Sequence, residues 1–148
     1  MNDADIHIRG VRVADIAAMH ELCADLGYDT EPSLVPERLN RIVSDPSQAV
    51  YVAERDGGVV GFVHLFTRHA LEIDACAQIQ ALVVGPDARR NGAAALLITA
   101  AEVWARGRGL AWLSLYCTTN RDAAHDFYPA LGFEAASTAT RFNKRLDG

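Results

Sequence analysis

The sequence has few of the features that mark an exported or nucleic-acid-binding protein. Its 3 cysteines among 148 residues are an odd number at wide spacing, which fits neither a disulfide framework nor a zinc site with paired ligands. The 14 lysines and arginines are outnumbered by 19 acidic residues, so the formal charge is -5. Nucleic acids and anionic membrane surfaces attract a cationic face, and neither is therefore expected as a partner.

Long apolar runs are also missing. The most apolar stretch, residues 93–105, is interrupted by Thr99 and Glu102 and is shorter than the roughly 20 residues that a membrane-spanning helix needs. The N-terminus is acidic where a signal peptide would be basic. These absences predict a cytoplasmic protein with reduced thiols. Because half of the residues are hydrophobic, the length suffices for one core, and we expect a single domain over residues 1–148.

The hydrophobic pattern predicts strands and helices in mixed order, without internal repeats. The expected strands are residues 6–13, 49–53, 59–66, 78–84 and 110–116, with a closing strand or two after residue 131. The expected helices are residues 16–26, 37–43, 90–106 and 121–131, and we expect Asp15 to cap the first of them and Gly27 to end it. The glycines of residues 55–58 predict a hairpin turn between the second and third strands. This order predicts an α/β (α+β) fold in which a mixed sheet carries helices on its faces.

One connection carries a chemical signal, between the buried strand that ends at Val84 and the long helix that follows. Gly92-Ala93-Ala94 has small side chains that leave main-chain N–H groups exposed at the start of the helix. These amides have no acceptor within the helix, and the helix dipole adds roughly half a positive charge there. Arg89 and Arg90 add full charges at an end where the dipole otherwise repels them. The connection therefore predicts a site for a polyphosphate.

The segment Arg89-Arg90-Asn91-Gly92-Ala93-Ala94 resembles the pyrophosphate loop of the GNAT superfamily of N-acetyltransferases, which reads Arg/Gln-x-x-Gly-x-Gly/Ala. Leu82-Val83-Val84 is similar to the family's Leu-x-Val stretch, which runs beside the pantetheine arm. A second motif follows in the correct order, since Asn120, residues 123–128 and residues 131–134 resemble Asn...Ala-x-x-Phe-Tyr-x-x-Leu-Gly-Phe. The resemblance implies a mostly antiparallel central sheet of six to seven strands flanked by about four helices.

The resemblance also implies the chemistry. A neutral amine would attack the thioester of acetyl-coenzyme A directly, with no metal, and the backbone N–H of Leu82 would stabilise the oxyanion. Tyr128 would protonate the departing thiolate. The residues implied to bind the coenzyme are Leu82, Val83, Val84, Arg89, Arg90, Asn91, Gly92, Ala93, Ala94, Asn120 and Tyr128. Two of these residues also fit a purely structural role: Asn120 fits a helix N-cap, and Tyr128 fits a half-buried packing residue.

The general base is missing at its usual place. Many relatives carry glutamate on the strand before the Leu-x-Val stretch, whereas this chain has Gln78 and Gln80. An amide cannot accept a proton at neutral pH, so these residues can only bind substrate or orient a water. Glu72, Asp74 or His64 could act through a water, and no base is assigned.

The acceptor site is expected between the first two helices, the loop of residues 28–36 and the third and fourth strands. Asp29, Glu31, Glu72 and Asp74 would make part of this cleft acidic, which suits a cationic amine, a polyamine or an aminoglycoside. Glu31, Gln78 and Gln80 are thus the predicted substrate-binding residues. A protein N-terminus or lysine as acceptor, another acyl group and a homodimer all stay open.

Two other functions remain as alternatives. The glutamines allow a coenzyme-binding module that has lost turnover and serves as a sensor or partner-binding subunit. The loop could also bind a different phosphate ligand, such as a nucleotide. The chain lacks both a Gly-x-x-x-x-Gly-Lys-Ser/Thr loop and a Gly-x-Gly-x-x-Gly turn, which weighs against a nucleotide.

Overall fold

A computed structural model describes residues 5–88, 92–117 and 122–147. The chain forms two compact units, Met1–Tyr116 and Cys117–Gly148. In these described ranges, the first unit holds a five-stranded sheet with three α-helices, and the second holds one further helix. The predicted α+β class with about four helices is confirmed.

The sheet has the order β1-β2-β3-β4-β5 and is antiparallel except for the parallel pair β4–β5. Its strands are β1 (Ile6–Gly10), β2 (Gln48–Arg55), β3 (Gly58–Arg68), β4 (Cys76–Val84) and β5 (Leu113–Leu115). The strand count is five, lower than the six to seven expected, because no strand forms in residues 131–147. Residues 134–147 are exposed throughout, and without a ladder partner an extended segment neither pairs its backbone nor buries side chains.

The β2–β3 connection forms the predicted hairpin turn. Asp56 and Gly57 have φ angles of 53° and 80°, both in the left-handed region. A two-residue turn of this kind follows the right-handed twist of the strands, and asparagine, aspartate and glycine adopt it at the least cost. The turn therefore sets the register of β2 on β3.

The helices are α1 (Ile16–Asp25), α2 (Val35–Val43), α3 (Ala93–Gly107) and α4 (Asp122–Ala130), with short 3-10 turns at Val13–Asp15, Pro32–Leu34 and Pro86–Ala88. α2 begins two residues earlier than expected, because Pro36 falls in the first turn, where its missing N–H removes no helix hydrogen bond. α1 ends at Asp25, and the predicted stop Gly27 follows with φ 94°.

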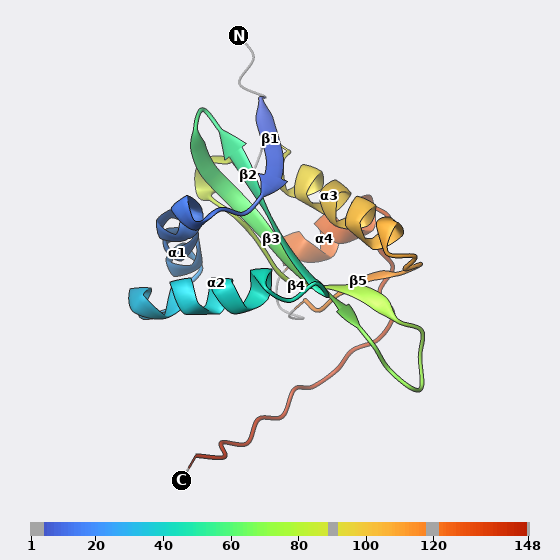
Figure 1. Ribbon diagram of the computed structural model, residues 1–148. Helices are drawn as coiled ribbons and strands as arrows, with labels where there is room; N and C mark the ends of the chain where they lie inside the picture. The colour runs from blue at the N-terminus through green and yellow to red at the C-terminus, as the bar shows by residue number, and fades with distance from the viewer. Residues whose placement is uncertain (1–4, 89–91, 118–121, 148) are drawn as a thin grey trace. The chain divides into compact units, whose positions relative to one another are not determined.

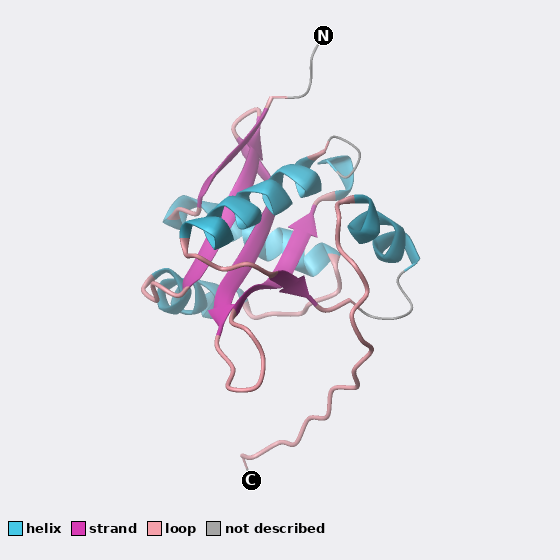
Figure 2. Cartoon of the chain, turned by 90° about the vertical axis from the view of Figure 1, so that its right-hand side faces the viewer, coloured by secondary structure: helices cyan, strands magenta, loops and turns pink. Residues whose placement is uncertain are grey.

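Within the first unit, α1 and α2 pack on one face of the sheet and α3 packs on the other (Figure 1). Figure 2 shows α3 lying across the strands. The α1/α2 face is built on Met19, Leu22, Leu39, Val50, Val52, Phe62 and Val83. On the α3 face, Val63, Leu65, Leu97 and Ile98 are at most 2% exposed. Each such side chain contributes roughly 1.5–3 kcal/mol through burial.

Gly61 allows the closest approach between β3, β4 and α3. A Cβ at this position would lie 2.8 Å from the carbonyl oxygen of Val83 and 3.4 Å from Leu97 Cδ1. The first distance is shorter than van der Waals contact, so any side chain would push β3 from β4. Because Gly61 has no side chain, the second half of β4 can pack closely against β3 and the start of α3.

A partly buried ion network joins β1, β2 and the start of α1. Arg9 donates from both terminal nitrogens to Asp15, at 2.9 Å each, and from Nε to Glu54 at 2.6 Å. Asp15 was expected to cap α1, but its carboxylate instead accepts the Arg12 N–H at 2.7 Å and makes no cap bond to α1. These hydrogen bonds from Arg9 hold the pKa of Asp15 and the pKa of Glu54 below their ordinary values.

Among the described residues, no helix is long and apolar enough to cross a membrane.

Asp15→Asn is expected to lower the free energy of unfolding by about 2 kcal/mol at pH 7, since it weakens a buried charge pair. A carboxyl with a depressed pKa in the folded state stabilises that state above its unfolded pKa and loses this contribution as the pH falls. The deficit of the variant should therefore shrink between about pH 5 and pH 2, as measured by urea unfolding. Glu37→Gln breaks only an exposed pair with Arg41 and should cost less than about 0.5 kcal/mol. A pH-independent deficit for Asp15→Asn would contradict the assignment.

Candidate active site

β4 contains a β-bulge at Gln80. His64 of β3 pairs with Ala81, whereas Leu65 pairs with Ile79, so Gln80 is the extra residue. A bulge interrupts the strict alternation of side chains and bends the strand. Gln78 lies before the bulge, half-buried opposite Phe66, while Gln80 is exposed. The two predicted substrate-binding glutamines therefore do not lie in one regular row.

The far edge of β4 is only partly paired. β5 pairs in parallel with Ala77, Gln78 and Ile79, and no described strand pairs with that edge from Gln80 to Val83. The pairing of β4 with β5 therefore ends at the bulge. An opening in the ladder follows, bordered by the backbone of β4.

The direction of the Leu82 N–H follows from the hydrogen-bond alternation. Gly85 donates to Val60 O at 2.8 Å, so its N–H points toward the β3 side. Main-chain groups of an antiparallel strand alternate between its two edges, which turns Val83 toward β3 and Leu82 away from it. The amide of Leu82 therefore faces the unpaired edge, where the resemblance required a donor.

Within the described part of the chain, no side-chain hydrogen bond caps the first main-chain amides of α3. Gly92 is the N-cap with φ 82°, a left-handed conformation that favours glycine, and nothing lies within 4 Å of where a Cβ would stand. Its carbonyl accepts the first helical hydrogen bond, from Leu96 at 3.1 Å. Ala93 is fully buried. The predicted residues Arg89, Arg90 and Asn91 lie outside the described residues.

Tyr128 belongs to the second unit, near the end of α4. Its half-buried ring is held edge-on by Phe127 and Phe133, with centroids at 5.1 and 5.6 Å. Its carbonyl accepts from Leu131 at 3.0 Å and from Phe133 at 3.2 Å, which closes the helix end. The Leu-Gly-Phe part of the motif thus fixes the tyrosine backbone and ring. Asn120 lies outside the described residues.

The predicted acidic residues of the acceptor side are all exposed, namely Asp29, Glu31, Glu72 and Asp74. Asp29 and Glu31 flank Thr30, whose carbonyl oxygen lies 2.8 Å from His20 Nε2. This contact ties the loop after α1 back onto the helix. Glu72 and Asp74 lie between β3 and β4.

His64 is the one base candidate that is half-buried. Its Nε2 lies 2.7 Å from Gln48 Oε1, and burial lowers the pKa of the imidazole below its ordinary value of 6.5. Gln48 was not among the residues singled out from the sequence. It lies 16 positions from His64, and only the strand register brings the two together.

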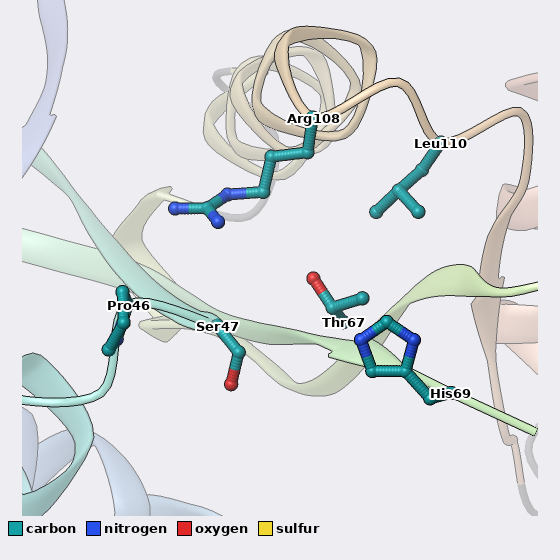
Figure 3. A pocket seen from close by; sticks show the side chains of 6 residues that line it. All are labelled: Pro46, Ser47, Thr67, His69, Arg108 and Leu110. Atoms are coloured by element: carbon teal, nitrogen blue, oxygen red, sulfur yellow. The ribbon is translucent and has the colours of Figure 1, made fainter.

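A separate hollow of about 330 Å³ lies between the start of β2, the end of β3 and the C-terminal end of α3 (Figure 3). Its lining consists of Pro46, Ser47, Thr67, His69, Arg108 and Leu110. Arg108 also stacks on Trp104, 4.5 Å from the ring centroid. None of these lining residues is a predicted site residue, and the hollow lies at the opposite end of α3 from Gly92. Within the described ranges, no group of three or more histidine, cysteine or acidic side chains could hold a metal ion.

Comparisons with known proteins extend over most of the chain. The model of the acetyltransferase (GNAT) family matches residues 16–133. The aminoglycoside N(6')-acetyltransferase type 1 of Klebsiella aerogenes is 28% identical over 97% of this chain and 99% of its own. A solved aminoglycoside N-acetyltransferase, AAC(6')-Iy in complex with CoA, has a TM-score of 0.88 at 20% identity and covers 98% of each chain. A solved transcriptional regulator from Bacillus halodurans has a TM-score of 0.86 at 23% identity, covering 94% of this chain and 99% of its own. These two structural likenesses concern the fold alone.

Proposed function

The chain belongs to the acetyltransferase (GNAT) family, and we propose that it transfers the acetyl group of acetyl-coenzyme A to a primary amine of a small molecule. The observation that carries the proposal is the edge of β4 at Leu82, which no described strand pairs with, followed by the start of α3 at its N-cap Gly92. We also propose that both units act as one N-acetyltransferase domain over residues 1–148, since the family match spans the boundary between them. A cytoplasmic location stays a prediction from the sequence.

The residues present fit the coenzyme. The amides of the first α3 turn and the charges of Arg89 and Arg90 suit its diphosphate. The stretch Leu82-Val83-Val84, with the edge that opens at Leu82, suits its pantetheine arm, which offers amide groups for strand-like hydrogen bonds. Asn91, Gly92, Ala93, Ala94 and Asn120 complete the proposed coenzyme set. When bound, the coenzyme supplies the activated thioester.

The proposed reaction needs two protein groups at the thioester. The neutral amine forms a bond to the carbonyl carbon, and the electron pair moves to the oxygen, where the Leu82 N–H donates to it. The carbon–sulfur bond then breaks, and Tyr128 donates its phenolic proton to the departing thiolate. The attacking nitrogen releases one proton to solvent in the same sequence, and a proton from solvent restores the Tyr128 phenol. The products are an N-acetyl amide and the thiol of coenzyme A.

For the acceptor we propose a cationic amine of the aminoglycoside type. The match to an aminoglycoside acetyltransferase over nearly the whole chain supports this class. The exposed carboxylates Asp29, Glu31, Glu72 and Asp74 would attract an acceptor that carries several ammonium groups. Gln78 and Gln80 are proposed to bind it through their amides. A protein or peptide amine is the second acceptor class.

A coenzyme-binding module without turnover is the competing function. The amides of Gln78 and Gln80 in place of carboxylates favour it. The likeness of the fold to a transcriptional regulator is compatible with it, although fold alone does not decide function.

The proposal is tested by release of coenzyme A thiol from acetyl-coenzyme A in the presence of a panel of amines. Aminoglycosides and polyamines should accelerate release at least about tenfold over the protein without acceptor, and lysine-containing peptides should do so less. Acetylated product is identified by mass spectrometry. Tight coenzyme binding with no thiol release for any amine would favour the module instead.

Arg90→Ala, and Arg89→Ala in a separate variant, should weaken coenzyme A binding about tenfold or more, because each removes a charge-assisted contact to the diphosphate. Calorimetry at two salt concentrations is the measurement, and the loss should be larger at low salt. Arg108→Ala is the matched control, since Arg108 lies at the other end of the same helix. Equal losses in all three variants would contradict a site at the α3 start.

Tyr128→Phe should lower kcat by about 10²-fold or more while coenzyme affinity changes little, because only the proton donor is lost. Tyr51→Phe on β2 serves as the control and should leave kcat unchanged. The kcat of both variants is measured at saturating acceptor. A wild-type kcat in Tyr128→Phe would exclude the proposed acid.

A further inference from the structure

Asp45, Gln48 and His64 form a continuous series of hydrogen bonds that runs from the turn before β2 onto the sheet. The Asp45 carboxylate accepts from the backbone N–H and hydroxyl of Ser47, at 2.9 and 2.7 Å, and from Gln48 Nε2 at 3.1 Å. Gln48 Oε1 lies 2.7 Å from His64 Nε2. The hydrogen bonds from Gln48 and Ser47 hold the pKa of Asp45 below its ordinary value, so the Asp45 carboxylate is ionised at neutral pH.

The chemistry of the three groups fixes the proton on the imidazole. A carboxylate can only accept, so the atom that Gln48 turns toward Asp45 must be its NH₂ nitrogen. The atom turned toward His64 is then the carbonyl oxygen, which can also only accept. His64 therefore donates from Nε2, and in the neutral ring the lone pair remains on Nδ1. The protein thus presents His64 as a base in one tautomer.

The strand register places this imidazole beside the proposed reaction centre. His64 pairs across β3 and β4 with Ala81, the residue directly before Leu82. Residues paired in this way share a face, and the cross-strand partners of His64, Val50 and Ala81, belong to the core under α1 and α2. Gln78 lies on the same face, two pairs further along β4, opposite Phe66. The small side chain of Ala81 occupies little of the space between His64 and the unpaired edge.

Few other charges on the surrounding elements compete for this role. Asp45 is engaged with Ser47 and Gln48, and Arg68 donates to the buried thiol of Cys76 at 2.9 Å. Burial raises the pKa of Cys23 on α1, so this thiol is neutral. The remaining ionisable groups on α1 and α2 are exposed (Glu21, Asp25, Glu37, Arg38 and Arg41), or bonded elsewhere, as His20 is to Thr30. Glu54 lies at the far end of β2 with Arg9.

We propose that His64, with its tautomer set by Gln48 and Asp45, removes the proton that the acceptor ammonium must lose before it attacks. The inference rests on the proposed acetyl transfer. The ammonium gives its proton to a water, and that water gives one to Nδ1 of His64. The imidazolium that forms is stabilised by the Gln48 carbonyl and, one link further, by the Asp45 carboxylate. After the thiol leaves, His64 returns the proton to solvent. His64 takes the place of the missing carboxylates as a base that acts through a water.

The first test uses His64→Gln, whose side-chain nitrogen can still donate to Gln48 but cannot take up a proton. With an alkylammonium acceptor, kcat/KM at pH 7 should fall about 10²-fold. With hydroxylamine or a hydrazide, which is already neutral at this pH, the loss should be less than about threefold. His69→Gln, an exposed histidine on the neighbouring loop, is the control and should match wild type.

The second test is the pH profile of the double variant Asp45→Asn/Gln48→Glu. The amide introduced at position 45 can donate to the carboxylate introduced at position 48, which then accepts from His64. The hydrogen-bond pattern is thus kept while a charge moves next to the imidazole. An adjacent carboxylate raises the pKa of a histidine, and the acid limb of kcat/KM should move up by about one pH unit. A residue with only a structural role would leave the limb in place.

The outcomes separate the two proposals. Selective loss with protonated acceptors, or the shifted acid limb, supports the role of His64. If wild type releases thiol but His64→Gln loses equal activity with both acceptor types or none, and the double variant keeps the wild-type limb, the inference is overturned and the enzyme assignment stands. If wild type binds coenzyme A yet releases no thiol with any amine, both proposals fall. Thermal unfolding and coenzyme A affinity of each variant verify that the fold is retained, and the double variant decides if His64→Gln does not fold.

Discussion

The hydrogen-bond ladder along β4 is the constraint on which the candidate site depends. On the β3 side the ladder runs the full length of the strand, whereas on the β5 side it stops at Ile79. The bulge at Gln80 lies at that point. A strand that is secured on one edge and unpaired on the other offers fixed main-chain donors and acceptors to a ligand without losing its own position. The amide of Leu82 is the donor that this asymmetry turns toward the unpaired edge.

Packing on both faces keeps that edge in place. Gly61 lets β3 and β4 approach α3 more closely than any other residue would allow, and Leu97 closes the contact from the helix. On the opposite face, Val83 and Phe62 lie in the core under α1 and α2. The same helix that covers the sheet begins at Ala93, directly after its N-cap Gly92. One rigid element therefore supports the strand at Leu82 and also presents the amides proposed to hold the diphosphate.

The electrostatics of the acceptor side follow from residue types that do not titrate near neutral pH. Gln78 and Gln80 remove the carboxylates that would make β4 a proton acceptor, and the remaining acids are exposed to solvent. In the proposed mechanism, His64 of β3 accepts the proton in place of a carboxylate on β4, and the side chains of Gln48 and Asp45 set its tautomer. Its imidazole is kept neutral by burial rather than by a charged neighbour. A base of this kind is ready to accept a proton at neutral pH without first losing one.

The sequence by itself determined the local features. Periodicity located the strands and helices, the glycines of residues 55–58 defined the hairpin, and the motifs around Gly92 and Tyr128 pointed to the family and its coenzyme. These signals are local because turn conformations and helix starts depend on neighbouring residues. Only the tertiary structure decided what depends on register: the bulge at Gln80, the short pairing of β5, the missing closing strand, the Arg9–Asp15 pair that replaced a helix cap, and the contact of Gln48 with His64. A shift of one residue in the pairing of two strands would turn every paired side chain to the other face of the sheet. No local sequence pattern records which register is chosen.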